Sequence, residues 1–420
     1  MNILIKSATI LDKTSTYHQQ TKDILIKNGI ITAIESSVSN TTNYPEIKLK
    51  NLHVSQGWFD SSVCFGEPGF EERETLANGL QVAAKSGFTN IAINPNTNPI
   101  IDNNTTVTFI KSKSDAHAVT VHPIGALTKN SAGVDLAELY DMQQGGAVAF
   151  GDYQHAIENP NLLKIALQYT QNFDGLVLSY PQENKIAGKG IVNEEATSTA
   201  LGLKGIPNLA EELQVARDLF LLEYTGGKLH IPTISTAKSV QLIAAAKAKG
   251  LQVTCSVAIA NLVLTDAEIT EFDTHFKLLP PLRTKADNKA LLAGLENGTI
   301  DFVTSNHTPI NFEYKNIEFD YAQYGSIGLE TAFGVLNTIL STEKIVELFT
   351  QNKAIFKVTN AKIAVGEKAI LTFFDPKETH TFTKKDILST SKNSCFLGTT
   401  LKGYVYGIYN NNQLILNDNN

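Results

Sequence analysis

Eight short apolar runs recur through the middle of the chain, and helical patterns separate most of them; this alternation restricts the possible folds more than any other feature. The runs are residues 58–65, 88–94, 118–125, 146–151, 175–180, 228–234, 251–257 and 301–305. The helical patterns are residues 71–86, 134–142, 160–169, 208–224, 236–249 and 285–296. Continuous apolar strands that alternate with helices are typical of a parallel sheet. Eight such units within about 250 residues predict an α/β fold, a TIM-like (β/α)8 barrel.

A doubly wound open sheet is the structural alternative. It is disfavoured because no glycine-rich phosphate loop follows the first strand. The two ends of the chain read differently from the middle, with β-branched runs at 3–5 and 23–26 and further strand patterns at 369–374 and 404–409. We therefore expect a β domain built from residues 1–54 and 363–420, around a barrel of residues 55–362.

Composition narrows the function classes. The net charge is −7 over 420 residues, which argues against a nucleic-acid binder because such a protein needs a basic face. No run of 18 or more apolar residues predicts a membrane span. The three cysteines are far apart and form no metal knuckle, so we expect a reducing, cytoplasmic setting.

Chemistry in a barrel of this kind sits at the carboxyl ends of the strands. These ends carry mostly neutral polar residues, among them Asn94, Asn96, Asp152 and Asn306. The nine histidines include no HxH or HxxxH pair. A hydrolytic metal site needs three or more His, Asp or Glu ligands, and the sequence does not provide them at these positions.

Motifs along nearly the whole chain nevertheless resemble one family. Residues 57–69 read G-W-F-D-S-S-V-C-F-G-E-P-G, similar to the dihydroorotase signature G-F-I-D-x-H-V-H-L-R-E-P-G of the amidohydrolase superfamily. Further matches in the same order lie at 83–89, 94–99, 146–152, 193–207, 229–237, 280–283 and 391–398. The resemblance implies a TIM-like barrel with a composite β domain, in agreement with the interpretation of the strands and helices.

The departures from the family pattern fall on its metal ligands. The positions that the resemblance assigns to ligands are Ser62, Cys64, Tyr153, Thr233 and Asn306, and the fifth-strand histidine falls within Ser179-Tyr180-Pro181. Asn306 also stands where the family has its general-base Asp, and an amide cannot accept a proton in place of a carboxylate. Asp152 is the one remaining carboxylate of a ligand type. We therefore expect no metal cofactor and no catalytic residue.

The substrate-binding positions implied by the resemblance have changed as well. The arginine that grips the substrate carboxylate is Gly66, the Asn before Pro-Pro-Leu-Arg is Leu279, and the second histidine of the last strand is Ile310. Asn96 and His307 match the family. These five positions are interpreted as a vestigial substrate pocket.

Several single residues are interpreted as structural rather than functional. Cys64 lacks a sequence-local base and is interpreted as a buried thiol rather than a nucleophile, and Cys255 and Cys395 as packing residues. His230 is expected to make a structural hydrogen bond, His122 has no evident partner, and Arg283 is expected in an ion pair.

Three functional hypotheses remain open. The first is a non-catalytic dihydroorotase homologue of the pyrimidine pathway, a homo-oligomer for which the resemblance implies aspartate transcarbamoylase as partner. The second is an active zinc-dependent dihydroorotase, which interconverts N-carbamoyl-L-aspartate and L-dihydroorotate. The third is a metal-free binder of a small neutral ligand in the same pocket.

Overall fold

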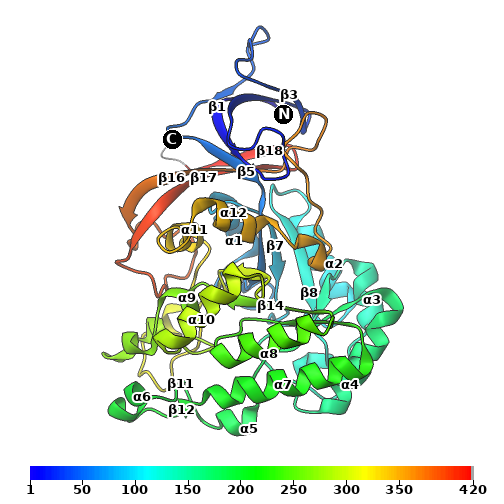
Figure 1. Cartoon of the computed structure of the whole chain (residues 1–420), viewed down its shortest axis with the longest axis vertical. Coiled ribbons are helices and arrows are strands. Elements are labelled where there is room, and N and C mark those ends of the chain that lie inside the picture. The colour runs from blue at the N-terminus through cyan, green and yellow to red at the C-terminus, as the bar shows by residue number, and fades with distance from the viewer. Residues whose placement is uncertain (418–420) are drawn as a thin grey trace.

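The computed structural model describes residues 1–417 and contains a parallel barrel and a mixed sheet, arranged one above the other along the long axis (Figure 1). The barrel strands follow the order β15-β14-β13-β10-β9-β8-β7-β6, which confirms the predicted TIM-like fold. Their bounds are β6 (Trp58–Val63), β7 (Phe88–Ile93), β8 (Thr120–Gly125), β9 (Ala149–Phe150), β10 (Leu176–Leu178), β13 (Lys228–Ile231), β14 (Val253–Ala258) and β15 (Phe302–Thr304). Every one lies within or overlaps an apolar run of the sequence.

The first and last strands close the barrel through few contacts. A parallel bridge pairs Val63 with His307, and the Cys64 N–H donates to the His307 carbonyl at 2.8 Å. Fully buried Asp60 in β6 accepts hydrogen bonds from the Thr304 hydroxyl and, at 2.9 Å, from the Ser305 N–H. One buried carboxylate thus ties β6 to β15.

Helices surround the barrel. The longer ones are α1 (Leu76–Lys85), α2 (Asn104–Ser114), α3 (Leu139–Gly145), α4 (Pro160–Thr170), α7 (Asn208–Thr225), α8 (Ala237–Ala248), α10 (Lys285–Glu296) and α12 (Thr342–Thr350). Shorter elements are α5 (Asn184–Ala187), α6 (Ala196–Leu201), α9 (Ala260–Val263), α11 (Ala332–Leu336), β11 (Val192–Asn193) and β12 (Gly205–Ile206). The sequence did not predict α2, because its Thr- and Asn-rich first turns have poor helix propensity. The Asn103 side chain starts this helix by accepting from the Thr106 N–H at 3.1 Å.

Both ends of the chain form the second sheet, as predicted. Its order is β18-β17-β16-β5-β1-β2-β3, with β4 beside β1. The bounds are β1 (Asn2–Leu11), β2 (Thr21–Lys27), β3 (Ile30–Glu35), β4 (Glu46–Ile47), β5 (His53–Gln56), β16 (Leu371–Thr381), β17 (Thr400–Asn410) and β18 (Gln413–Leu416). The antiparallel pair β5 and β16 joins the N-terminal strands to the C-terminal ones.

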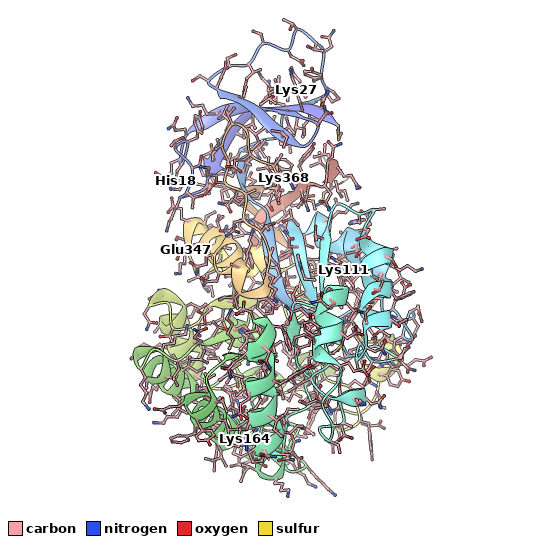
Figure 2. All side chains as sticks on the ribbon, turned by 90° about the vertical axis from the view of Figure 1, so that its right-hand side faces the viewer. His18, Lys27, Lys111, Lys164, Glu347 and Lys368 are labelled. Atoms are coloured by element: carbon pink, nitrogen blue, oxygen red, sulfur yellow. The ribbon has the colours of Figure 1, made fainter. Side chains whose placement is uncertain are left out.

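A buried aromatic cluster connects the two parts. The Trp58 ring lies 5.1 Å from the rings of Phe333 and Phe349 and 5.5 Å from that of Phe374, so β6, α11, α12 and β16 share one core. Figure 2 shows Lys27 and Lys368 in the sheet above this junction and Lys164 on α4 at the opposite end of the barrel. Within residues 1–417, no helix combines the length and the apolar character that a membrane crossing requires.

Candidate functional site

The carboxyl ends of the barrel strands meet around one small cavity. Of the eleven site positions derived from the family pattern, five line it. They are Ser62, Asp152, Tyr153, Thr233 and Asn306. The cavity has a volume of about 20 Å³. That is room for about one water molecule, because one water needs at least roughly 10–15 Å³ of such space.

We call this end of the barrel, around the cavity, the mouth. A chain of neutral hydrogen bonds joins the first and last strands there. The Asn94 amide donates to the Ser62 hydroxyl at 3.0 Å, and that hydroxyl lies 3.4 Å from the Asn306 side-chain oxygen. The same amide lies 3.5 Å from the Cys64 sulfur. None of these groups carries a formal charge, so this part of the mouth can hydrogen-bond but offers no strong base.

Two tyrosines fill the mouth. Tyr153 and Tyr180 both line the cavity, and the Tyr153 hydroxyl is 3.1 Å from the Thr308 hydroxyl. Burial raises the pKa of both phenols well above the usual value. Both rings therefore act as neutral space-filling groups. Tyr153 stands at a ligand position of the family pattern, and Tyr180 lies in the stretch where the family's fifth-strand histidine falls.

Cys64 stands beside the cavity rather than in its lining. Burial raises the pKa of its thiol, although the side chains of Tyr153, Asn94, Asn96 and Thr308 around it oppose the shift. A protonated thiol is a poor nucleophile and a poor metal ligand, since the thiolate is the reactive form.

Asp152 is occupied by a local contact. One carboxylate oxygen accepts from the Thr128 N–H at 2.9 Å, and the other accepts from the Thr128 hydroxyl. Burial raises the pKa of this carboxyl group. Both oxygens thus hold the loop after β8. This contact gives the buried carboxylate a structural role that needs no metal ion.

The donors at the mouth do not fit zinc. Across residues 1–417, no three His, Cys, Asp or Glu side chains are grouped closely enough to hold a metal ion. Serine and threonine hydroxyls and an asparagine amide are not the ligands that zinc takes in proteins.

The backbone retains unusual geometry where the side chains have changed. Tyr153, Thr233 and Asn306 have φ angles of 56°, 47° and 47°. Such left-handed conformations are costly for residues with a side chain, above all for β-branched threonine, and they cluster at functional sites. Three of the strand-end positions thus carry strained backbone.

The five positions of the vestigial substrate pocket do not come together around the cavity. Gly66 is closed off, since a Cβ there would lie 1.8 Å from the Phe70 carbonyl oxygen. Ile310 is buried, and its N–H donates to Asn393. Leu279 packs against Ala187, Ile206 and Ala210, and its carbonyl accepts from Gln154 at 2.9 Å. The side-chain oxygen of Asn96 is buried without a partner among the described residues.

His307 is not among the residues that line the cavity. Its Nδ1 accepts from the Gly328 N–H at 3.2 Å, and within residues 1–417 its Nε2 has no partner. Burial lowers the pKa of this histidine to about 4.

Three other expectations can be compared with the structure. His230 bonds to the hydroxyls of Thr254 at 2.9 Å and Ser256 at 3.2 Å, as expected of a structural histidine. His122 does have a partner, the Asn90 amide oxygen at 3.0 Å. The ion pair expected for Arg283 is absent from the described contacts; its direct partners are neutral oxygens, because Ser235 stands between it and Glu211.

Sequence reasoning missed Asp60 and the filling role of Tyr180. An Asp inside an apolar strand signals a buried polar contact, so Asp60 could have been found. The role of Tyr180 depends on how neighbouring strand ends converge, which no local pattern encodes.

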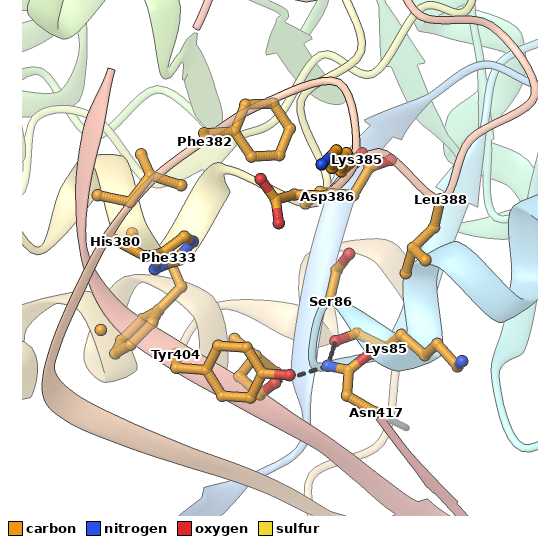
Figure 3. Close-up of a pocket in the computed structure, with 15 residues that line it drawn as sticks. Lys85, Ser86, Phe333, His380, Phe382, Lys385, Asp386, Leu388, Tyr404 and Asn417 are labelled. Atoms are coloured by element: carbon orange, nitrogen blue, oxygen red, sulfur yellow. Dashed lines mark hydrogen bonds between the residues drawn. The ribbon is translucent and has the colours of Figure 1, made fainter. Parts of the chain in front are cut away.

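A larger cavity of about 220 Å³ lies elsewhere, between the barrel and the terminal sheet (Figure 3). Ser86 after α1, Phe333 of α11 and His380 of β16 are among its walls. Ser86 Oγ and His380 Nδ1 have no hydrogen-bond partner among the described residues. This cavity shares no lining residue with the strand-end site.

A parallel barrel with polar strand ends and a sheet from both termini defines an amidohydrolase-type fold. An L-hydantoinase from Arthrobacter aurescens has the same architecture, with a TM-score of 0.85 and 22% identity over 99% of this chain and 96% of its own. A dihydropyrimidinase from Brevibacillus agri gives a TM-score of 0.83 at 19% identity, over 100% and 95%.

The sequence relatives define the family more narrowly. The family model described as dihydro-orotase-like matches residues 53–239. A protein of Pelotomaculum thermopropionicum named dihydroorotase is 38% identical over 425 residues, covering 100% of this chain and 99% of that relative. Another of that name, from a Thermoanaerobacter species, is 38% identical over 96% of this chain and 95% of its own. The chain belongs to the dihydroorotase family.

Proposed function

We propose that this chain is a dihydroorotase-family protein that does not catalyse the metal-dependent opening and closure of a cyclic amide, and that it serves as a structural partner of aspartate transcarbamoylase. One observation carries the first half of the proposal: the cavity at the strand ends has a volume of about 20 Å³ and neutral donors around it. A dihydroorotate ring and a metal ion with its bound hydroxide do not fit into that space together.

The chemistry of the mouth supports the same conclusion. Hydrolysis of an amide needs an activated water and a group that moves its proton. Asn306 cannot accept that proton, and the thiol of Cys64 is held protonated by burial. The well-packed barrel around this site fits a chain that is maintained for its fold and surface.

An active dihydroorotase is the second candidate, and the names of the relatives favour it. Identity of 38% over the whole chain would transfer that activity if the strand-end residues were disregarded. This candidate requires the mouth to open and to assemble a metal site from residues such as Asp152.

The decisive experiment measures dihydroorotate hydrolysis by the purified protein, with and without added zinc, beside an Asp152→Ala variant. We expect no hydrolysis above the uncatalysed rate at any zinc concentration. Zinc-dependent turnover that disappears in the variant would establish the second candidate instead.

The partner is tested separately. Mixing the protein with aspartate transcarbamoylase of the same organism should give one complex in size-exclusion chromatography with multi-angle light scattering. Two separate peaks at micromolar concentration would reject the partnership, whatever the outcome of the activity measurement.

A further inference from the structure

The cavity between the barrel and the terminal sheet, which we call the junction cavity, concentrates polar atoms that lack partners. Fifteen described residues line its volume of about 220 Å³. Nine buried side-chain nitrogen and oxygen atoms of residues 1–417 have no hydrogen-bond partner, and three of these belong to its walls: Ser86 Oγ, Glu330 Oε2 and His380 Nδ1. Buried polar groups in folded proteins nearly always have a partner. These atoms therefore indicate that the junction cavity takes a polar group of a ligand.

Glu330 is the strongest acceptor of the three. It lies just before α11, its side chain is 6% exposed, and its Oε1 accepts from the Ser389 N–H at 3.0 Å and the Ser389 hydroxyl at 2.8 Å. Its Oε2 is 4.0 Å from His307 Nδ1, which is beyond hydrogen-bond distance, and that nitrogen already accepts from the Gly328 N–H. A buried carboxylate oxygen without a donor is costly, and a cation that donates to it removes this cost.

A second carboxylate and a helix end make the same space more negative. Asp386 uses its Oδ2 to accept from the Thr383 N–H and the Thr383 hydroxyl, both at 2.7 Å. Figure 3 shows the Asp386 carboxylate and the Ser86 hydroxyl pointing into the junction cavity. Ser86 is the C-terminal cap of α1, so the negative end of that helix dipole also lies at the wall.

The remaining walls fit the body of an organic cation rather than a metal ion. Phe333, Phe382 and Tyr404 present aromatic rings, which attract cations as well as apolar groups, and Leu388 and Leu401 add aliphatic surface. Within the described part of the chain, no three His, Cys, Asp or Glu side chains lie close enough together to hold a metal ion. The junction cavity thus combines acceptors for N–H groups with apolar walls.

The two lysines among the lining residues do not place a positive charge inside. Figure 3 shows the Lys85 ammonium pointing away from the junction cavity. Lys385 belongs to the exposed segment after β16, where water and salt screen its charge. Glu330 is therefore the charged group that lies deepest in the wall.

We propose that the junction cavity binds the primary ammonium group of a small organic amine. An ammonium carries three N–H donors, which matches in number the acceptors Glu330 Oε2, Ser86 Oγ and His380 Nδ1. The walls come from α1, α11, β16 and β17, so the bound amine holds the barrel to the terminal sheet and stabilises the folded chain. This site is separate from the strand ends, and its test is independent of the proposed function.

Saturation-transfer NMR on the intact protein measures binding of n-butylamine, with n-butanol and butyrate as neutral and anionic probes of the same length. We expect n-butylamine to bind in the millimolar range and to raise the Tm, and the other two probes to do neither. Equal binding of n-butanol, any binding of butyrate, or no binding of n-butylamine would overturn the proposal. Putrescine and L-norvaline carry the same group on a diamine and on an amino acid, and they distinguish these two sources of the ammonium.

Two conservative variants locate the bound ammonium. Glu330→Gln keeps an oxygen for Ser389 but replaces the second oxygen by a donor, and it should raise the Kd of n-butylamine about 10-fold or more. Ser86→Ala should raise the Kd about 5-fold without lowering the Tm, because Ser86 Oγ has no partner to lose.

Glu74→Gln is the matched control for a changed buried carboxylate. Glu74 is also buried and holds the neighbouring Thr390, but it does not line the junction cavity, so the Kd should stay at the wild-type value. An n-butylamine affinity that is equal in the wild type, Glu330→Gln and Ser86→Ala would overturn the proposal, since the amine would then be bound elsewhere.

Discussion

The barrel mouth and the buried contacts behind α7 are both polar, but only one of them keeps its charges. At the mouth, Ser62, Asn94 and Asn306 exchange neutral hydrogen bonds. Behind α7, the buried Arg283 guanidinium donates to the Ser235 hydroxyl at 3.1 Å, and Ser235 donates to the carboxylate of Glu211. We call these three residues the Arg283 network. Charged groups thus hold the frame behind α7, whereas Ser62, Asn94 and Asn306 at the strand ends are neutral and the one carboxylate there, Asp152, is bound to Thr128.

The largest expected effect comes from breaking the Arg283 network. Arg283→Met should lower the free energy of unfolding by about 3–5 kcal/mol, because Glu211 stays buried without its compensating charge. Urea denaturation measures this, with exposed Lys285→Met as the control. A loss below about 1 kcal/mol would mean that the Arg283 network contributes no more to stability than a neutral hydrogen bond at the mouth does.

Restoring the family arginine tests whether the mouth can be rebuilt. Gly66→Arg should cost about 2–3 kcal/mol, because its Cβ would overlap the Phe70 carbonyl. Ser37→Arg, at an exposed position in the terminal sheet domain, is the control for an added arginine that meets no obstacle. A Gly66→Arg protein as stable as the wild type, with measurable dihydroorotate binding by calorimetry, would contradict the closed mouth.

Acid should weaken the fold through His307. Burial lowers its pKa in the fold to about 4, from 6.5. Between these values the unfolded chain binds a proton that the fold does not, so this contribution is complete above pH 6.5 and is lost as pH falls toward 4. At about pH 5 the loss amounts to about 2 kcal/mol. His307→Gln should reduce the pH dependence of unfolding by that amount, as measured by urea denaturation.

The smallest effect is expected at the first ligand position. Ser62→Ala removes neutral hydrogen bonds and should cost about 1 kcal/mol. Dihydroorotate hydrolysis should be the same as for the wild type. Loss of a measurable zinc-dependent rate in this variant would place Ser62 in a working site and would erase the contrast with the Arg283 network.

The barrel was predictable from the sequence, because a continuous apolar run indicates a strand that is buried on both faces of a parallel sheet. The terminal sheet was predictable for a related reason. Strand patterns occur at both ends of the chain, and the backbone groups of such strands need partners in a neighbouring strand. Helix α2 was not predictable, because the capping contact of Asn103 outweighs the poor helix propensity of its first residues. The filling of the mouth by Tyr153 and Tyr180 depends on how separate strand ends converge, which periodicity does not contain.

The pairing of β5 with β16 also has a consequence for how the protein folds during its synthesis. The strands up to Gln56 emerge from the ribosome first, yet their antiparallel neighbour begins only at Leu371. The N-terminal strands must therefore wait through synthesis of the entire barrel with one edge open to other chains. A chain cut short before Leu371 never covers that edge, so the unpaired strand stays exposed to chaperones and proteases.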